Sequence, residues 1–208
     1  MEDVDVLVVG AGPVGLLLGT ELQRDGVAVS VIDGMPARGF FCKALGITPR
    51  TLEIFDDLGI VDRAIEAGVW LTGVETWVDG AMVPARSMHV PEQGLPYGSL
   101  SLAQYETERL LEAAFTEHGG RVHYGFKLDS FVETGDGVEA FLTGPHGEAR
   151  TVRCRWLASD VTARIARCVR HWGCHTKARN FRRLLHSLTW TSTGPIRAGR
   201  CTASNGAM

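Results

Sequence analysis

The last 48 residues of this 208-residue chain contain neither aspartate nor glutamate. All 24 acidic residues lie in residues 1–160 with 12 of the 21 lysines and arginines, so the two segments carry net charges of about −12 and +9. Three of the five cysteines and three of the seven histidines also fall in the short basic segment. This uneven composition predicts a folded domain over residues 1–160 and a basic, disordered tail over residues 161–208.

Other common features are also missing. No apolar run approaches the ~18 residues that a membrane-spanning helix needs. The first residues, MEDVDVLVVG, lack the basic start and the cleavage pattern of a signal peptide. Five cysteines, an odd number without regular spacing, do not indicate a disulfide framework. We therefore expect a cytoplasmic protein that has no membrane partner.

Residues 4–33, VDVLVVGAGPVGLLLGTELQRDGVAVSVID, follow the order of a parallel βαβ unit: a buried strand, a glycine turn, a helix and a second β-branched strand. Gly10 permits the tight turn, Gly12 lets a pyrophosphate approach the backbone, and Gly15 lets the helix lie close to the strand. Pro13 stands where the start of a helix tolerates a missing N–H. The free N–H groups of this helix start would face the phosphates.

Asp33 ends the second strand, 23 residues after Gly10, where its carboxylate can accept hydrogen bonds from ribose hydroxyls. A carboxylate there would oppose a 2′-phosphate, so the pattern favours the adenosine half of FAD or NAD. The alternative is a glycine-rich turn without a ligand. The combination of strand, turn, helix, strand and terminal acid indicates a dinucleotide site.

Two later segments separate FAD from NAD by resemblance. KALGITPRTLEIFDDLGIVDRAIEAG and SLAQYETERLLEAAFTEHGGRVHYG resemble the flavoprotein monooxygenases of the aromatic hydroxylase (para-hydroxybenzoate hydroxylase) type, over most of residues 4–160. The resemblance implies an α/β, Rossmann-like FAD-binding domain, incomplete here, with antiparallel strand excursions. It also implies FAD as cofactor, NADPH or NADH as reductant, and O2-dependent hydroxylation of a small aromatic substrate.

The same resemblance implies roles for two side chains. Lys43 would approach the flavin, although a solvated surface lysine is an equal alternative because the family more often has arginine here. Gln104 would lie beside the FAD, where an amide can both donate and accept. Arg109 has a weaker claim, and we favour its pairing with Glu106 or Glu112 on the helix surface.

Local signals predict the remaining elements. Gly59 separates two short helices, Asp79-Gly80 is the turn of a hairpin, and a helix runs from Gln104 to Gly119. After it, strands are broken by GDG and PHGE turns. Five residues of the first helical segment are expected in the core: Leu52, Ile54, Phe55, Leu58 and Ile60. Four scattered histidines have no metal-ligand spacing, so we expect no metal site among them: His89, His118, His123 and His146.

The tail contains Cys168, His171, Cys174 and His175 among basic residues. A zinc site would have unsuitable spacing for a tetrahedral ion, and a nucleic-acid-binding arm would lack any folded recognition motif, so we expect no nucleic-acid partner. We favour a third interpretation, in which the tail is read out of frame. In the family, the strand before this tail runs into a turn of the form D-G-x-x-S-x-V-R-x-x-L-G.

The genetic code supports a frame break near residues 159–161. When the same bases are read one nucleotide earlier, His171-Trp172 must give Leu and Trp172-Gly173 must give Gly. Arg167-Cys168 gives only Val, Leu or Met, and Cys168-Val169 only Arg or Cys. One permitted set of codons converts the start of the tail to CDGAHSTVRQALGVPYEG, which contains the missing turn.

Two other classes of function remain open from the sequence. A nicotinamide-dependent Rossmann oxidoreductase would share the first forty residues, but it should show further βα repeats after Asp33. A non-catalytic nucleotide-binding module with a nucleic-acid-binding tail would depend on the basic segment. A truncated family member would lack the later Gly-Asp segment that holds FAD, so we expect the chain to be inactive in hydroxylation.

Overall fold

The computed structural model describes residues 3–40, 42, 44–73, 75–83 and 96–159, together with the short strand at 167–168. The chain divides into two units, Met1–Trp172 and Gly173–Met208, and all the described residues belong to the first. Within the described part of the chain, no helix is both long enough and apolar enough to cross a membrane.

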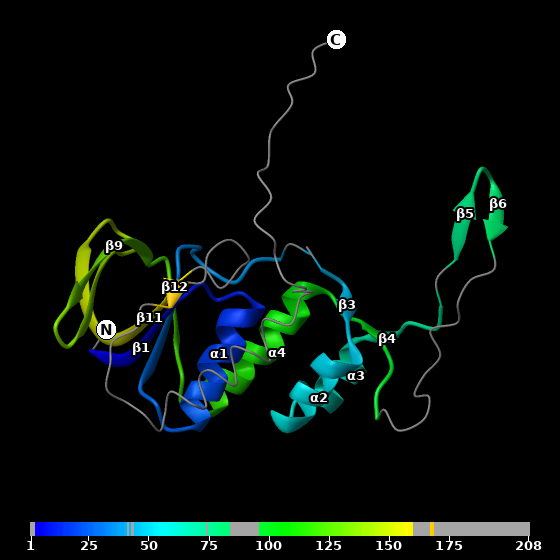
Figure 1. Ribbon diagram of the computed structural model, residues 1–208, viewed down its shortest axis with the longest axis horizontal. Helices are drawn as coiled ribbons and strands as arrows, with labels where there is room; N and C mark the ends of the chain where they lie inside the picture. Colours follow the sequence, from blue (N-terminus) through cyan, green and yellow to red (C-terminus); the bar gives the residue numbers. More distant parts are fainter. Residues whose placement is uncertain are drawn as a thin grey trace, which may run out of the picture. The chain divides into compact units, whose positions relative to one another are not determined.

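The main sheet has seven strands in the order β8-β2-β1-β11-β10-β9, with β12 paired to β11 (Figure 1). Strands β8, β2, β1 and β11 run parallel to one another, whereas β9 and β10 are antiparallel. This arrangement confirms the predicted α/β fold with antiparallel excursions. The strands are β1 (Val4–Val9), β2 (Val29–Asp33), β8 (Val122–Tyr124), β9 (Lys127–Thr134), β10 (Gly137–Thr143), β11 (Ala149–Ser159) and β12 (Arg167–Cys168).

Strand β11 belongs to both parts of the sheet. Its first half pairs antiparallel with β10, and from Cys154 onward it pairs parallel with β1. Leu7 of β1 and Ile32 of β2 are fully buried in one cluster with residues of β10 and β11. The antiparallel strands therefore supply the apolar cover for one face of the parallel strands. The turns between β9, β10 and β11 fall at the GDG and PHGE segments, as the sequence predicts.

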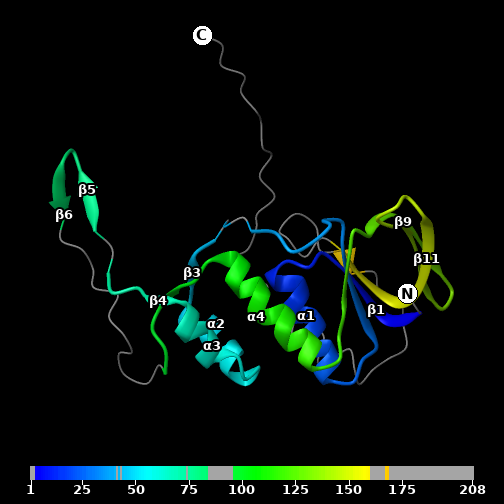
Figure 2. The same ribbon diagram turned by 180° about the vertical axis from the view of Figure 1, so that it is seen from behind.

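Two helices cover the opposite face, namely α1 (Pro13–Arg24) and α4 (Gln104–Glu117), which lie side by side in Figure 2. A Cβ atom at Gly19 would lie 2.8 Å from Val31 of β2 and 3.4 Å from the Phe115 ring of α4. Four residues further along each segment, Gly119, just beyond the end of α4, approaches Gln23 of α1, where a Cβ atom at Gly119 would lie 4.0 Å from Nε2 of Gln23. The two helices therefore run parallel, and both begin at the carboxyl end of the parallel strands.

Helices α2 (Pro49–Asp57) and α3 (Val61–Ala67) form where two short helices were predicted. The Thr48 side chain caps α2 by accepting from the N–H of Thr51, and Gly59 separates the helices with φ +71°. Four of the five expected core residues are buried: Leu52, Phe55, Leu58 and Ile60. Ile54 is only half-buried. It projects about 100° away from Phe55, at the edge of the buried stripe.

Two smaller sheets complete the described part. β3 (Gly46–Ile47), β7 (Leu100–Ser101) and β4 (Val69–Trp70) form one, and the hairpin of β5 (Thr76–Val78) and β6 (Ala81–Val83) forms the other. The hairpin turns at Asp79 and Gly80, with φ of 50° and 79°, as predicted for an Asp-Gly turn. Apart from β12, the tail over residues 161–208 lies outside the described residues, so its disorder stays a prediction.

Candidate functional site

The glycine turn joins the end of β1 to the start of α1. Gly10 has φ +109°, a backbone conformation that residues with a Cβ atom rarely adopt. Its N–H donates to the Ile32 carbonyl at 2.8 Å. Gly12 is the N-cap of α1 and provides no side-chain cap, while Pro13 is the first helical residue. The N–H groups of the first turn are thus left without a side-chain partner from the N-cap. Such a helix start favours negatively charged ligand groups.

Gly15 brings the helix against the end of the strand. A Cβ atom at this position would lie 1.9 Å from the carbonyl oxygen of Gly10, which is backbone and cannot rotate away. The close approach of helix and strand is therefore built into the sequence at Gly15, as the glycine spacing predicts.

Two backbone N–H groups hold the Asp33 carboxylate, one at each of its oxygens. Its Oδ2 atom accepts from the N–H of Ala11 at 2.8 Å, and its Oδ1 atom accepts from the N–H of Met35 at 2.8 Å. Each oxygen can accept a further hydrogen bond, and the residue is half-buried at the edge of the sheet. This carboxylate is thus held directly beside the glycine turn with capacity for hydroxyl donors.

Gln104 begins α4 and is paired with a buried acid one turn later. Its Nε2 atom donates to Oε1 of Glu108 at 2.8 Å, and Glu108 is only 8 % exposed. Thr107, between them, is also buried, and its hydroxyl has no hydrogen-bond partner among the described residues. The first turns of α4 therefore carry three polar side chains, those of Gln104, Thr107 and Glu108, near the carboxyl end of the parallel strands.

A second cluster lies next to Asp33. Tyr124 of β8 is the register partner of Asp33, and Glu112 of α4 accepts from the Tyr124 hydroxyl at 3.1 Å and from Arg38 at 2.8 Å. Burial raises the pKa of Tyr124, and the charge of Glu112 raises it further, so the phenol remains protonated as a donor. This cluster ties α4 and β8 to the segment that follows β2.

Arg109 pairs with Glu106 at 2.7 Å, which confirms the interpretation as a surface ion pair. The other predicted partner, Glu112, binds Arg38 instead, across a separation of 74 residues. Sequence analysis gave no signal for Arg38. Glu108 could have been found, because residues four apart on a helix share a face and Gln104 had already been singled out.

The structure brings most of the predicted site residues to one end of the parallel strands, namely Gly10, Gly12, Pro13, Gly15 and Asp33. Gln104 starts the parallel helix α4 at that same end. Lys43 lies outside the described residues, as do the cysteine and histidine side chains of the tail. Among the described side chains, no group of three or more potential ligands could hold a metal ion.

Comparisons with known proteins agree with this geometry. A family described as an FAD binding domain matches residues 3–160. A flavin-dependent monooxygenase of Mycobacteroides abscessus is 30% identical over 170 residues, which cover 71% of this chain and 36% of that protein.

Two solved structures are similar in fold. The p-nitrophenol 4-monooxygenase of Pseudomonas putida superposes with a TM-score of 0.71 and 26% identity, over 76% of this chain and 41% of that one. Aklavinone-11 hydroxylase, solved as a ternary complex with FAD and aklavinone, gives a TM-score of 0.64 and 30% identity, over 76% and 32% of the two chains. The chain thus spans about a third of the length of the relatives it matches.

Proposed function

The chain belongs to the family of FAD-binding domains of flavin-dependent aromatic monooxygenases, and from this premise we propose that residues 3–160 bind the FAD of an aromatic hydroxylase. The observation that best supports this proposal is the hydrogen bond from the backbone N–H of Ala11, in the glycine turn, to the Asp33 carboxylate at 2.8 Å. This contact sets an acceptor for ribose hydroxyls beside N–H groups suited to phosphates.

The residues present fit the adenosine diphosphate half of FAD. Gly12 has φ −73° and ψ 178°, an extended conformation that any residue adopts, so its backbone does not require glycine. Because glycine has no side chain, residue 12 cannot itself accept from the N–H groups of the first turn, as a serine or aspartate cap would, and in this proposal the pyrophosphate accepts from them instead. Gly10 and Gly15, in contrast, are required by the turn and by the helix contact.

In this proposal the chain's residues hold and orient the cofactor. The backbone N–H groups at the start of α1 bind the pyrophosphate, Asp33 accepts from the ribose, and Gln104 and Lys43 act nearer the ring. Bound FAD supplies the redox chemistry, with NADPH or NADH as reductant, O2 as oxidant and a small aromatic compound as substrate.

We propose that the 208-residue chain by itself gives little or no coupled hydroxylation. The family match covers residues 3–160, and the relatives are about three times as long as the matched segment. A reduced flavin that is only partly enclosed would pass its two electrons and two protons to O2 and release hydrogen peroxide, because coupled hydroxylation needs a cavity that excludes water.

The tail belongs to a related proposal, that the chain is read out of frame from about residues 159–161 onward. Support comes from the end of the family match at residue 160, where the acidic residues also end. Resequencing the coding DNA from the codon for Arg150 tests this. A restored base followed by an Asp-Gly turn supports the proposal as a misread sequence, and an unchanged sequence whose shifted frame encodes that turn supports it as a break in the gene. DNA in which no frame encodes an Asp-Gly turn at this place refutes it.

The functional test measures flavin retention and coupling on the purified chain. We expect flavin absorbance to co-purify or to be restored by added FAD, with reductant consumed mainly to form hydrogen peroxide. Product equal to the NADPH consumed, with a phenol as substrate, would refute the proposed lack of coupling. Failure to retain any FAD would refute the binding function itself.

A further inference from the structure

The contact between Gln104 and Glu108 fixes which way the Gln104 amide faces. A carboxylate has no proton to donate, so the group it binds at 2.8 Å must be the amide nitrogen of Gln104. The amide carbonyl oxygen, Oε1, then faces away from Glu108. Because Glu108 is 8 % exposed, this contact is shielded from competing water.

The position of the pair follows from the packing of the two helices. Phe115 lies against Gly19 of α1, and Glu108 and Gln104 precede it by seven and eleven residues, about two and three helical turns. All three side chains therefore lie on the stripe of α4 that faces α1. Gly19 lies opposite Phe115, and the two helices are parallel. Glu108, seven residues before Phe115, therefore lies at about the height of Gly12, seven residues before Gly19. Gln104 lies one turn beyond the open start of α1.

We infer that Glu108 is a positioning residue that makes Gln104 present its carbonyl oxygen to a hydroxyl of the ribityl chain of the bound FAD, since Asp33 already takes the ribose. This inference rests on the proposed FAD-binding function and deepens it. Phosphate oxygens only accept hydrogen bonds, whereas the hydroxyls of ribose and of the ribityl chain can donate. The negative charge of Glu108 also disfavours a phosphate beside Gln104.

Thr107 provides independent support for a ligand at this place. Its hydroxyl is buried, at 5 % exposure for the residue, and has no partner among the described residues. Such a group is rarely left unpaired in a protein interior. Because it lies three residues from Gln104 on the same side of α4, it offers a second hydrogen-bonding group to the same ligand.

A double-mutant cycle on the full chain tests the inference. FAD affinity is measured by flavin fluorescence titration of the apoprotein for wild type, Q104A, E108A and Q104A/E108A. We expect each single variant to weaken FAD binding about tenfold. The double variant should weaken it no more than about twentyfold, well short of the roughly hundredfold loss expected for independent residues, because both changes remove the same hydrogen-bonded pair. ADP, which lacks the ribityl chain, should bind all four proteins within about twofold.

Two further variants separate positioning from a merely structural role. Q104E/E108Q restores the hydrogen bond with its roles exchanged and leaves an acceptor at position 104, so FAD affinity should return to within about threefold of wild type. Q104E alone places two carboxylates together and should bind FAD poorly. E106A, on the exposed side of the same helix turn, is the matched control and should bind FAD like wild type.

The outcomes are distinguishable from failure of the proposed function. Wild type that binds no FAD overturns both the function and this inference. Wild type that binds FAD, with effects of Q104A and E108A that add or with an equal loss of ADP affinity in E108A, overturns only the role of Glu108. A non-additive cycle with rescue by Q104E/E108Q establishes it.

Discussion

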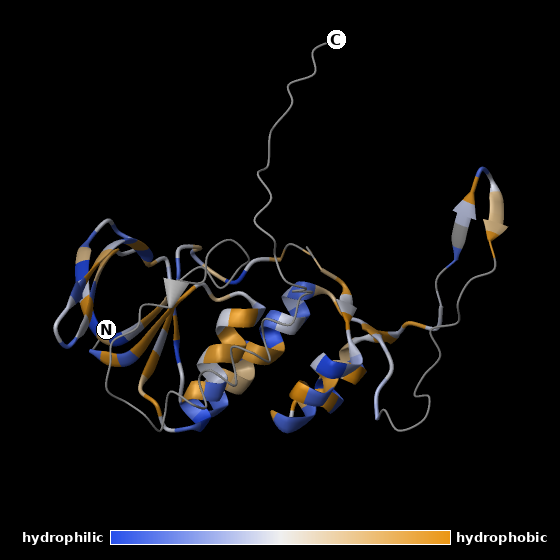
Figure 3. Ribbon diagram, in the orientation of Figure 1, coloured by the Kyte–Doolittle hydropathy of each residue, from blue (hydrophilic) through white to orange (hydrophobic). Residues whose placement is uncertain are grey.

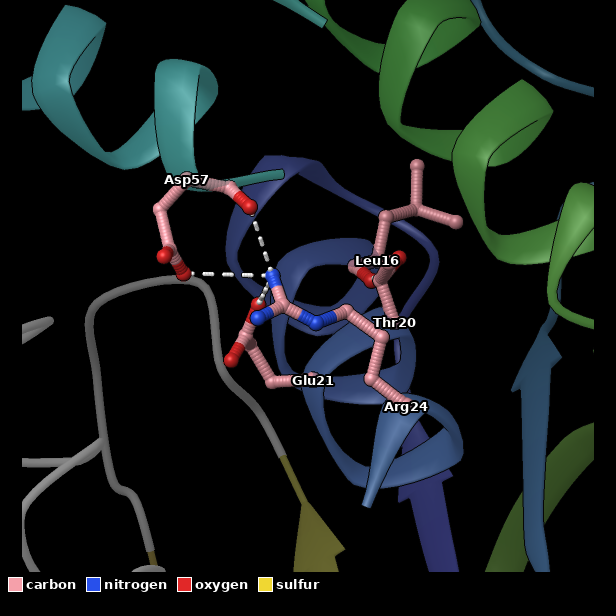
Figure 4. A network of polar contacts seen from close by, with 5 residues as sticks. All are labelled: Leu16, Thr20, Glu21, Arg24 and Asp57. Carbon is pink, nitrogen blue, oxygen red and sulfur yellow. Dashed lines mark hydrogen bonds and ion pairs between the residues drawn. The ribbon is translucent and has the colours of Figure 1, made fainter. Parts of the chain in front are cut away.

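The two ends of helix α1 are built in opposite ways. At its start, Gly12 provides no side-chain cap, and the first turn faces the end of the sheet. At its end, Arg24 donates through Nη1 to Glu21 at 3.1 Å and to both the carbonyl and the carboxylate of Asp57, at 3.0 and 3.1 Å (Figure 4). Hydropathy also differs along α1, whose early turns are hydrophobic and whose last turn is hydrophilic (Figure 3).

This difference indicates where the fold reserves binding capacity. The chain uses its own groups to satisfy the end of α1 and to connect it to α2, so those polar contacts contribute to stability. At the start of α1 the N-cap residue provides no side-chain acceptor for the backbone N–H groups, and the Asp33 carboxylate is held next to them. Substitutions at the open end should therefore change ligand binding, and substitutions at the closed end should change only stability.

The largest effect is expected for Gly15→Ala at the open end. The new Cβ atom would lie 1.9 Å from the Gly10 carbonyl oxygen, so the turn or the helix must move. We expect a loss of about 2–3 kcal/mol in unfolding free energy and about 100-fold in FAD affinity. Urea unfolding and fluorescence titration measure the two. Gly135→Ala, where a Cβ meets nothing within 4 Å, is the control and should leave both nearly unchanged.

Asp33→Asn should separate binding from stability. The amide cannot accept from both Ala11 and Met35 as the carboxylate does, so one backbone donor loses its partner. We expect FAD affinity to fall about 10–30-fold, while the melting temperature changes little once FAD is absent. Asp25→Asn, at the other end of α1, should bind FAD normally. An equal loss of affinity in both variants would contradict the comparison.

Arg24→Ala examines the closed end. Removal of the guanidinium leaves Glu21 and the Asp57 carbonyl without this donor, and because the pair is partly exposed we expect a loss of about 1 kcal/mol in unfolding free energy. FAD affinity should stay within about twofold of wild type. Arg153→Ala, which breaks an exposed pair with Glu139, should cost less. Weaker FAD binding in Arg24→Ala would show that the two ends are coupled.

The smallest effect concerns pH. Burial lowers the pKa of His123 below its usual 6.5, and the neighbouring Arg121 lowers it further. As pH falls below 6.5, the unfolded chain gains the proton first, so the stability due to neutral His123 is present above pH 6.5 and is lost toward its folded pKa. The urea midpoint of unfolding is measured at pH 5.5 and 7.5, about one pH unit below and above the ordinary histidine pKa. The difference between the two midpoints should be smaller in His123→Gln than in wild type. Exposed His118→Gln should retain the wild-type difference.

Local patterns predicted much of the fold and part of the site. Gly10, Gly15, Gly59 and Asp79-Gly80 stand where the backbone or the packing requires them, so their positions were readable from neighbouring residues. The pairing of β11 with β1, which joins Cys154 to Val4, was not readable, because it depends on the folded arrangement of distant segments.

The same distinction applies to the side chains of the site. Asp33 follows from its spacing after the glycine turn, and Gln104 came from a family resemblance. The partnership of Arg38 with Glu112 spans 74 residues and has no local signature. Glu108 is the intermediate case, since helical periodicity places it beside Gln104 but only the packing shows that it is buried.

FAD titration of the purified chain, alongside Gly15→Ala and Arg24→Ala, tests the central claim most directly. The account predicts that wild type and Arg24→Ala retain flavin after gel filtration, whereas Gly15→Ala does not. If wild type retains no flavin, or if Gly15→Ala retains as much as wild type, the open start of α1 is not the FAD site.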